Sequence, residues 1–369
     1  MKVKVDRDEL QKKLSDIQNI VEKKNTMPIL NHFLLAAEKK GGYITATDLE
    51  TALKEPILLN VQEEGRMCIT ARKLFEIARE MAGEISLEST DPQWLKVKCG
   101  KSHFRLACLS PDEFPAWPSL ETSRETEEIE IDSLTLLDII ERTLYAAGEA
   151  DTRYVLNGLL FHIMKGGVLN VIGTDGHRLA LSQKSIGPGP KEEKKLIISR
   201  KSVAELRRFL NEESKPVKLV MSKNHVLFVV DGIQFLTRLI EGTYPNYEQV
   251  LPASNNKIVS VDRNLLTKSL RMVSIMSKER SNAVKVDIDS KNMTISASNP
   301  DLGEAKDEIA VDYSGDPMTV AFNAKYLLDA LNAMDAETVV FKLNEPLSPA
   351  LIMEKGKEDY KCVVMPMRL

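Results

Sequence analysis

The sequence has no long apolar run, and its first residues are not expected to act as a secretory leader. None of its apolar segments approaches the roughly 20 residues that a transmembrane helix needs. The first residues, MKVKVDRDEL, are strand and helix material without the apolar core of a signal peptide. These absences predict a cytoplasmic protein.

Cysteine and the common ligand motifs are also scarce. The four cysteines form no C-x-x-C pair and lie in apolar or strand-like segments, which favours reduced thiols over disulfides or a zinc site. Histidines outside one short motif are scattered without ligand spacing. The segment GPGPK, at 187–191, fits neither phosphate-binding glycine motif. We therefore expect no metal and no cofactor.

An excess of positive charge is missing too. The net charge is −4, whereas proteins that bind nucleic acid indiscriminately are usually basic overall. The predicted helices carry a slight basic excess and the rest of the chain is acidic. Ordinary solvated helix faces would explain an asymmetry of this size equally well.

One arrangement is present three times. A short alternating strand leads into an aspartate and then an amphipathic helix at Asp6, Asp132 and Asp262, spaced by roughly 125 to 130 residues. Two further series have the same phase. Residues of N-cap type begin a second helix in each copy, and polar pairs follow a short apolar strand. They are Thr70, Ser199 and Asn323 for the helices, and Thr47, Thr174 and Ser298 for the pairs.

These phased series predict an α+β protein made of three copies of one domain. Each copy has the order strand, helix, strands, strand, helix, strands. The copies span 1–121, 127–245 and 257–369, and proline-containing linkers separate them. A chain of 369 residues is long enough for three such cores.

The fragment TDGHR, at 174–178, is the most tempting active-site motif. It places an aspartate, a histidine and an arginine within five residues. However, Asp-Gly between apolar strands is a strong hairpin signal, and no serine or cysteine nucleophile in a known context accompanies it. We favour a structural or binding role, and an enzyme built on His177 remains an alternative.

Paired basic residues recur on the second helix of two copies, at Arg72-Lys73, Arg200-Lys201 and Arg207-Arg208. Such residues are usually solvated helix charges. Their recurrence favours a common anion. A three-domain interaction scaffold that binds no nucleic acid remains the other alternative.

Several long segments then resemble a known family in the family's order. They are MPIL (27–30), TDLE (47–50), ARKLFEIAR (71–79), DEFP (112–115), RYVLNGLLFHI (153–163), TDGHRLAL (174–181), YPNYEQVLP (244–252), FNAKYLLDALNA (322–333) and VVMPMRL (363–369). Over essentially its whole length, the chain resembles the beta sliding clamps of bacterial DNA polymerase III.

The resemblance implies a non-catalytic processivity factor. Such a protein is a head-to-tail homodimer that closes six domains into a ring around duplex DNA, with two helices per domain inside and antiparallel sheets outside. It binds DNA independently of sequence and tethers the replicative polymerase, the clamp loader and repair factors. These partners carry short linear motifs with a glutamine followed by leucine and phenylalanine anchors.

The resemblance also implies three sets of residues. Phe104 and Leu106 are expected to face Ile275 and Met276 across the dimer contact. The residues expected to face phosphates are Lys24, Arg72, Lys73, Arg79, Arg200, Lys201, Arg207, Arg271 and Lys278. The residues expected to form a peptide pocket are Arg153, Tyr154, Leu156, Thr174, Gly176, His177, Arg178, Leu179, Pro245, Val250, Asn323, Tyr326, Leu347, Val363, Met365, Pro366, Met367 and Arg368.

Within the pocket, Gly176 is expected to let the turn approach a ligand backbone. Arg153, His177 and Arg178 are expected to hydrogen-bond ligand polar groups. The methionines of the carboxyl-terminal MPMRL suit several partners because the side chain adapts its shape. Gln249 departs from the arginine of some family members.

Overall fold

The computed structural model describes residues 1–21, 27–91, 93–118, 126–210, 213–277 and 282–368. These residues form two compact units, Met1–Asp132 with Arg208–Leu239, and Ser133–Arg207 with Ile240–Leu369. Within the described part, no helix combines the length and the apolar character required to cross a membrane.

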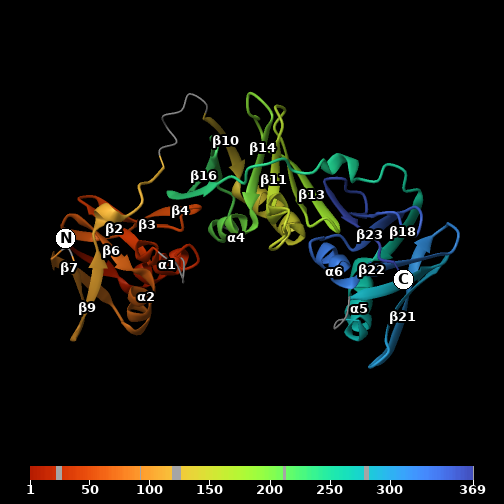
Figure 1. Cartoon of the computed structure of the whole chain (residues 1–369), viewed down its shortest axis with the longest axis horizontal. Helices are drawn as coiled ribbons and strands as arrows, with labels where there is room; N and C mark the ends of the chain where they lie inside the picture. The colour runs from red at the N-terminus through yellow and green to blue at the C-terminus, as the bar shows by residue number, and fades with distance from the viewer. Residues whose placement is uncertain (22–26, 92, 119–125, 211–212, 278–281, 369) are drawn as a thin grey trace. The chain divides into compact units, whose positions relative to one another are not determined.

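The first unit contains a 13-stranded antiparallel sheet in the order β10-β15-β16-β17-β4-β3-β2-β6-β9-β8-β7-β1-β5. Helices α1 and α2 lie side by side, with α1 against β4 and α2 against β6 (Figure 1). The elements are β1 (Lys2–Asp6), α1 (Arg7–Ile17), β2 (His32–Glu38), β3 (Gly41–Thr47), β4 (Thr51–Ile57), β5 (Asn60–Glu63), β6 (Gly65–Thr70), α2 (Ala71–Glu80), β7 (Glu84–Asp91), β8 (Trp94–Cys99), β9 (Ser102–Leu109), β10 (Glu127–Asp132), β15 (Pro216–Met221), β16 (His225–Val230) and β17 (Ile233–Arg238).

The second unit contains a 12-stranded antiparallel sheet in the order β14-β11-β12-β13-β25-β24-β23-β18-β21-β20-β19-β22. Its elements are α3 (Ser133–Thr143), β11 (Gly158–Ile163), β12 (Val168–Thr174), β13 (Arg178–Ser185), β14 (Lys194–Ser199), β18 (Lys257–Asp262), α5 (Arg263–Val273), β19 (Ala283–Ile288), β20 (Asn292–Asn299), β21 (Gly303–Tyr313), β22 (Met318–Asn323), α6 (Ala324–Asn332), β23 (Thr338–Leu343), β24 (Ala350–Glu354) and β25 (Tyr360–Val364). Helix α4 (Arg200–Phe209) contains the division between the units.

The element order confirms the predicted threefold repeat. The pairs β1-α1, β10-α3 and β18-α5 each begin a copy, and α2, α4 and α6 each follow a strand. The fold is α+β, and neither sheet closes on itself. Strands of neighbouring copies pair at both junctions, β17 with β4 and β25 with β13.

Most helices begin at the predicted residues because a side chain there accepts a backbone N–H. The carboxylate of Asp6 accepts from Asp8 and Glu9, and that of Asp262 accepts from Leu265. Ser199 and Asn323 cap α4 and α6 in the same way. Thr70 was expected to do so and does not: its hydroxyl lies 3.0 Å from Nε2 of His32.

A buried ion pair joins α1 to β4 in the first unit. Nζ of Lys13 lies 2.8 Å from Oε2 of Glu55, and the Glu55 side chain is fully buried. Its other oxygen has no hydrogen-bond partner among the described residues. Burial therefore raises the pKa of Glu55 to about 7, although the Lys13 ammonium opposes the shift.

This carboxyl should make the first unit lose stability as the pH rises. A pKa raised from 4.5 to about 7 gives a contribution that is complete below pH 4.5 and lost as the pH passes 7. At 1.36 kcal/mol per pKa unit, the loss is on the order of 3 kcal/mol. Both tryptophans, Trp94 and Trp117, belong to the first unit, so urea unfolding followed by tryptophan fluorescence measures it. In the matched variant E55Q, the fall of the unfolding free energy with rising pH should disappear. An unchanged fall in E55Q would assign the pH dependence to other groups.

Candidate functional site

A cavity of about 150 Å³ lies beside the junction of β13 and β25 in the second unit. In the junction, Leu179 pairs with Val363, and the next strand residue, Val364, leads into Met365. The N–H of Met365 donates to the carbonyl of His177 at 2.9 Å, which joins the chain end to the β12–β13 turn. The cavity is lined by Arg153, Leu156, Thr174, Gly176, Arg178, Leu179, Tyr244, Pro245, Tyr247, Val250, Val363 and Met365.

The TDGHR segment forms the hairpin turn that the sequence predicts. Thr174 pairs with Leu179 across the turn, and the Thr174 hydroxyl donates to the Arg178 carbonyl. The Asp175 carboxylate accepts the N–H groups of His177 and Arg178. Asp175 therefore holds the turn.

The close approach at Gly176 is made by a side chain of the same chain. Its φ of +84° belongs to the left-handed region that favours glycine. A Cβ at this position would lie 2.8 Å from Nη2 and 2.9 Å from Nη1 of Arg153. The glycine thus leaves room for an arginine of the same chain, and that arginine covers the turn.

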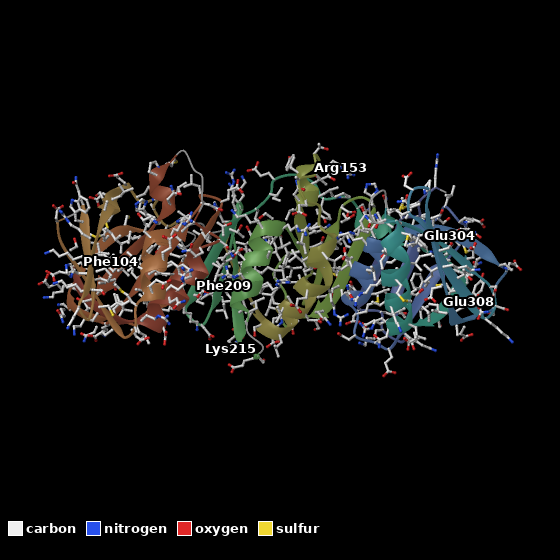
Figure 2. All side chains as sticks on the ribbon, turned by 90° about the horizontal axis from the view of Figure 1, so that it is seen from below. Phe104, Arg153, Phe209, Lys215, Glu304 and Glu308 are labelled. Carbon is white, nitrogen blue, oxygen red and sulfur yellow. The ribbon has the colours of Figure 1, made fainter. Side chains whose placement is uncertain are left out.

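Arg153 is exposed at the surface (Figure 2) and is held by its own neighbourhood. It donates to the carboxylate of Asp151 through Nε and Nη2, and Nη2 also donates to the carbonyl of Asp175. These donated hydrogen bonds lower the pKa of Asp151 to about 2. The cavity therefore has a positioned cation at its rim.

Arg178 was expected to donate to a ligand, and the structure assigns its nitrogens elsewhere. Nε donates to Asp175, Nη1 to Asp329 of α6, and Nη2 to the carbonyl of Tyr145. The side chain is buried and lies over the ring of Tyr326 at 4.5 Å. Arg178 therefore ties the turn to the third copy and forms a wall of the cavity.

Two aromatic residues that line the cavity were missed by sequence reasoning. Tyr244 and Tyr247 lie on either side of Pro245 in the segment YPNYEQVLP, of which only Pro245 and Val250 were expected in the pocket. The Tyr244 hydroxyl donates to the carbonyl of Ile172 at 3.2 Å, and that of Tyr247 lies 2.8 Å from Nδ1 of His162. The signal in the sequence that could have predicted them is the presence of large aromatic residues close to a proline.

Several expected pocket residues do not line this cavity. His177 stacks on Tyr326 with ring centroids 6.4 Å apart, and the Asn323 side chain is used as the cap of α6. The N–H of Met367 donates to the carbonyl of Ala321, so the chain end also has a structural contact. The residues outside the lining are Tyr154, His177, Asn323, Tyr326, Leu347, Pro366, Met367 and Arg368.

The expected phosphate-facing residues differ in how they are paired. Arg72 and Lys73 form ion pairs with Glu76 at 2.9 and 2.8 Å, and Arg79 pairs with Glu80. Three others lie on α4, where Arg200 donates to the carbonyl of Ala147, while Lys201 and Arg207 are exposed. Arg271 donates to the neutral amide of Asn332. Lys24 and Lys278 lie outside the described residues.

The expected dimer residues are apolar and partly exposed. Phe104 on β9 (labelled in Figure 2) is 45% exposed and lines a cavity of about 670 Å³ with Ile77 and Cys99. Ile275, in the turn after α5, is 64% exposed. Leu106 and Met276 are half-buried, and Met276 packs against the core of the third copy.

Comparisons with known proteins cover the whole chain. Three family models match in sequence: the N-terminal domain of the DNA polymerase III beta subunit at 1–118, its central domain at 130–246 and its C-terminal domain at 248–368. The beta sliding clamp of Pseudomonas putida is 34% identical over 99% of both chains, and that of Escherichia coli K12 is 32% identical over 100% of both.

Solved structures agree. The sliding clamp of Pseudomonas aeruginosa bound to griselimycin matches with a TM-score of 0.94 at 33% identity over the whole of both chains. The clamp of Bacillus subtilis matches with a TM-score of 0.95 at 25% identity, over 100% of this chain and 99% of that one.

Proposed function

The chain belongs to the DNA polymerase III beta subunit family, and on this premise we propose that two copies close head to tail into a ring of six domains around duplex DNA. Sliding clamps are non-catalytic processivity factors, and this chain functions as a DNA sliding clamp. The observation that carries the proposal is the threefold repeat, matched copy by copy along the whole chain. We place the copies at 1–121, 127–245 and 257–369, and the protein in the cytoplasm.

Physical reasoning supports a closed assembly. Each sheet ends in an open edge, and open edges invite further pairing. A closed cyclic arrangement can pair them through one repeated contact. Both junctions within the chain already extend a sheet from one copy into the next.

Retention on circular DNA tests the ring. After loading on nicked circular DNA, the protein should co-elute with the DNA on gel filtration and should be released when the DNA is cut to a linear form. Equal retention on circular and linear DNA would contradict topological binding. A scaffold without nucleic-acid binding would be retained on neither.

The cavity beside β13 and β25 is the proposed docking site for partner peptides. Its walls are apolar, and Arg153 supplies a cation at the rim. A glutamine followed by leucine and phenylalanine anchors suits such a site, because a few placed polar groups orient a ligand that is held mainly by apolar contact. An enzyme built on TDGHR is disfavoured, since Asp175 holds the turn and His177 stacks on Tyr326.

The dimer contact should depend on the exposed Ile275. Replacing it by aspartate places a charge in an apolar contact with Phe104 and should give a monomer in equilibrium sedimentation. The control variant L58D changes an exposed leucine of the first copy and should remain dimeric. An unchanged dimer mass in I275D would refute the assigned contact.

Phosphate contacts should show in the salt dependence of DNA binding. Removing Arg207 and Arg271, which have no carboxylate partner among the described residues, should lower the slope of log K against log salt by about 0.9 each. The control R72A should change it less, because Glu76 already offsets the Arg72 charge. No change of slope in the double variant would remove these residues from the DNA-facing set.

A further inference from the structure

The junction between the first two copies repeats the geometry of the proposed peptide site. Ala52 pairs with Leu236 where Leu179 pairs with Val363. The N–H of Arg238 donates to the carbonyl of Glu50 at 2.8 Å, as the N–H of Met365 donates to that of His177 at 2.9 Å. The two junctions therefore have the same register and the same closing hydrogen bond.

A second cavity, of about 70 Å³, lies at this junction and belongs wholly to the first unit. The residues that form its walls correspond to residues that line the first cavity. Phe114 and Pro115 take the places of Tyr244 and Pro245, and Thr47 takes that of Thr174. Trp117 and Leu236 correspond in the same way to Tyr247 and Val363.

The residue at the tip of its turn carries an exposed apolar side chain. Leu49 stands where the other turn has Gly176, and it adopts a φ of +75°. A left-handed backbone costs roughly 1 to 2 kcal/mol for a residue with a Cβ. Leu49 is nevertheless 54% exposed and lines the cavity. Strain of this kind concentrates at functional sites, and here it presents an aliphatic side chain to solvent.

Apolar exposure extends to Met27, which precedes the short helix Pro28–Asn31 as Arg153 precedes the short helix Tyr154–Asn157. Met27 accepts the N–H of Leu30 as Arg153 accepts that of Leu156. Met27 is 45% exposed. The position that supplies a cation to the first site thus supplies an adaptable apolar side chain in the first copy.

The charge at the rim is also changed. Glu50 replaces His177, and Thr51 replaces Arg178. The Asp48 carboxylate holds the turn by accepting the N–H groups of Glu50 and Thr51. The exposed Glu50 carboxylate has no hydrogen bond or ion pair within the described part of the chain. Among the residues that line the cavity, Glu50 carries a carboxylate and none is a lysine or an arginine, so the charge offered at the rim is negative.

We propose that this second cavity is a separate docking site for a short peptide that carries one aliphatic anchor flanked by lysine or arginine. The anchor fills the space among Ala52, Trp117 and Leu236, and the flanking cation pairs with Glu50. This cavity, of about 70 Å³, has about half the volume of the first one, of about 150 Å³, so it suits a single aliphatic anchor rather than a leucine and phenylalanine pair. This inference goes beyond the proposed function, because it concerns another cavity and a ligand that is recognised by its positive charge.

The emission of Trp117 provides a direct test. In a W94F background it is the sole tryptophan, and it lines the cavity. The full-length protein is titrated with the blocked peptide acetyl-Gly-Lys-Leu-Lys-Ser-Gly-amide to millimolar concentration. A saturable change of the Trp117 emission is expected. Binding should be at least tenfold weaker for a peptide in which glutamate replaces both lysines, or in which glycine replaces the leucine. The exposed variant E50K should reverse the charge preference.

Three results would overturn the proposal: no saturable change, an equal change with the glycine peptide, or a charge preference unaltered in E50K. A fluorescent peptide of the glutamine, leucine and phenylalanine type separates the two cavities. The lysine peptide should not displace it. If the lysine peptide displaces the fluorescent peptide over the same concentrations that change the Trp117 emission, it binds at the cavity beside β13. That result would also contradict the proposal.

Discussion

Replacing Arg142 by methionine is expected to lower the unfolding free energy of the second unit by about 3 to 5 kcal/mol. Arg142 on α3 is buried and reaches the fully buried Glu354 of β24 at 3.1 Å, with Asp138 and Asp335 as further partners. Without the arginine, the buried Glu354 carboxylate loses its closest cation and keeps only the more distant ammonium of Lys357, at 3.4 Å, and the N–H groups of Asp335 and Ala336. Burial opposes ionisation of Glu354, but the N–H groups of Ala336 and Asp335 and the charge of Arg142 lower its pKa overall.

Both tryptophans belong to the first unit, so their fluorescence does not report on the second unit. Hydrogen exchange at individual amides is therefore the suitable measurement. Amides of α3 and β24 in R142M should lose protection by two or more orders of magnitude. The control K184M removes a more exposed lysine that pairs with Asp138 and Asp359, and should cost about 1 kcal/mol or less. The double variant R142M/E354M should regain most of the loss, since it leaves no unpaired charge. Wild-type protection in R142M would contradict the expected contribution of this ion pair.

This ion pair matters for function because it joins the second copy to the third. Arg142 belongs to the second copy and Glu354 to the third, as do Arg178 and Asp329 beside the cavity. The proposed peptide site is built from both copies, from the turn before β13 and from the chain end after β25. Its shape therefore depends on buried charges that hold the junction together.

The repeat and the hairpin were predictable from sequence because each depends on local chemistry. Strand alternation, N-cap residues and the Asp-Gly pair act within a few residues, so the starts at Asp6 and Asp262 and the turn at Gly176 are visible in the chain. Thr70 shows the limit of this reasoning. Its hydroxyl finds a partner in His32, which is 38 residues away in sequence.

The roles of individual pocket residues depend on distant partners and could not be read locally. Arg178 looks like a ligand donor in TDGHR, yet Asp329, far along the chain, occupies one of its nitrogens. Tyr244 and Tyr247 look like linker residues, yet both face the cavity. The correspondence between the cavity at Leu49 and the cavity beside β13 is recognised only when the strand registers of the two junctions are compared.

Removing residues 365–369 is expected to weaken binding of a fluorescent motif peptide by at least about thirtyfold, the effect of losing a contact worth 2 kcal/mol. Met365 lines the cavity, and its N–H fixes the turn through the carbonyl of His177. The loss of this bond and of the one from Met367 to Ala321 should reduce stability by about 1 kcal/mol each, so a modest fall of the melting temperature is expected.

Matched variants separate the side chain from the backbone of this tail. Removing only residues 368 and 369 keeps both hydrogen bonds and should leave peptide affinity within about threefold of the full chain, less than 1 kcal/mol. M365L preserves volume and should bind nearly normally, whereas M365D places a charge in the apolar wall and should bind as poorly as the shortened chain. Fluorescence anisotropy gives the affinities, and sedimentation confirms that each variant remains a dimer. Full peptide affinity in the chain that ends at Val364 would mean that partners dock elsewhere. If that chain fails to fold and M365D binds the peptide normally, the tail is a structural element only.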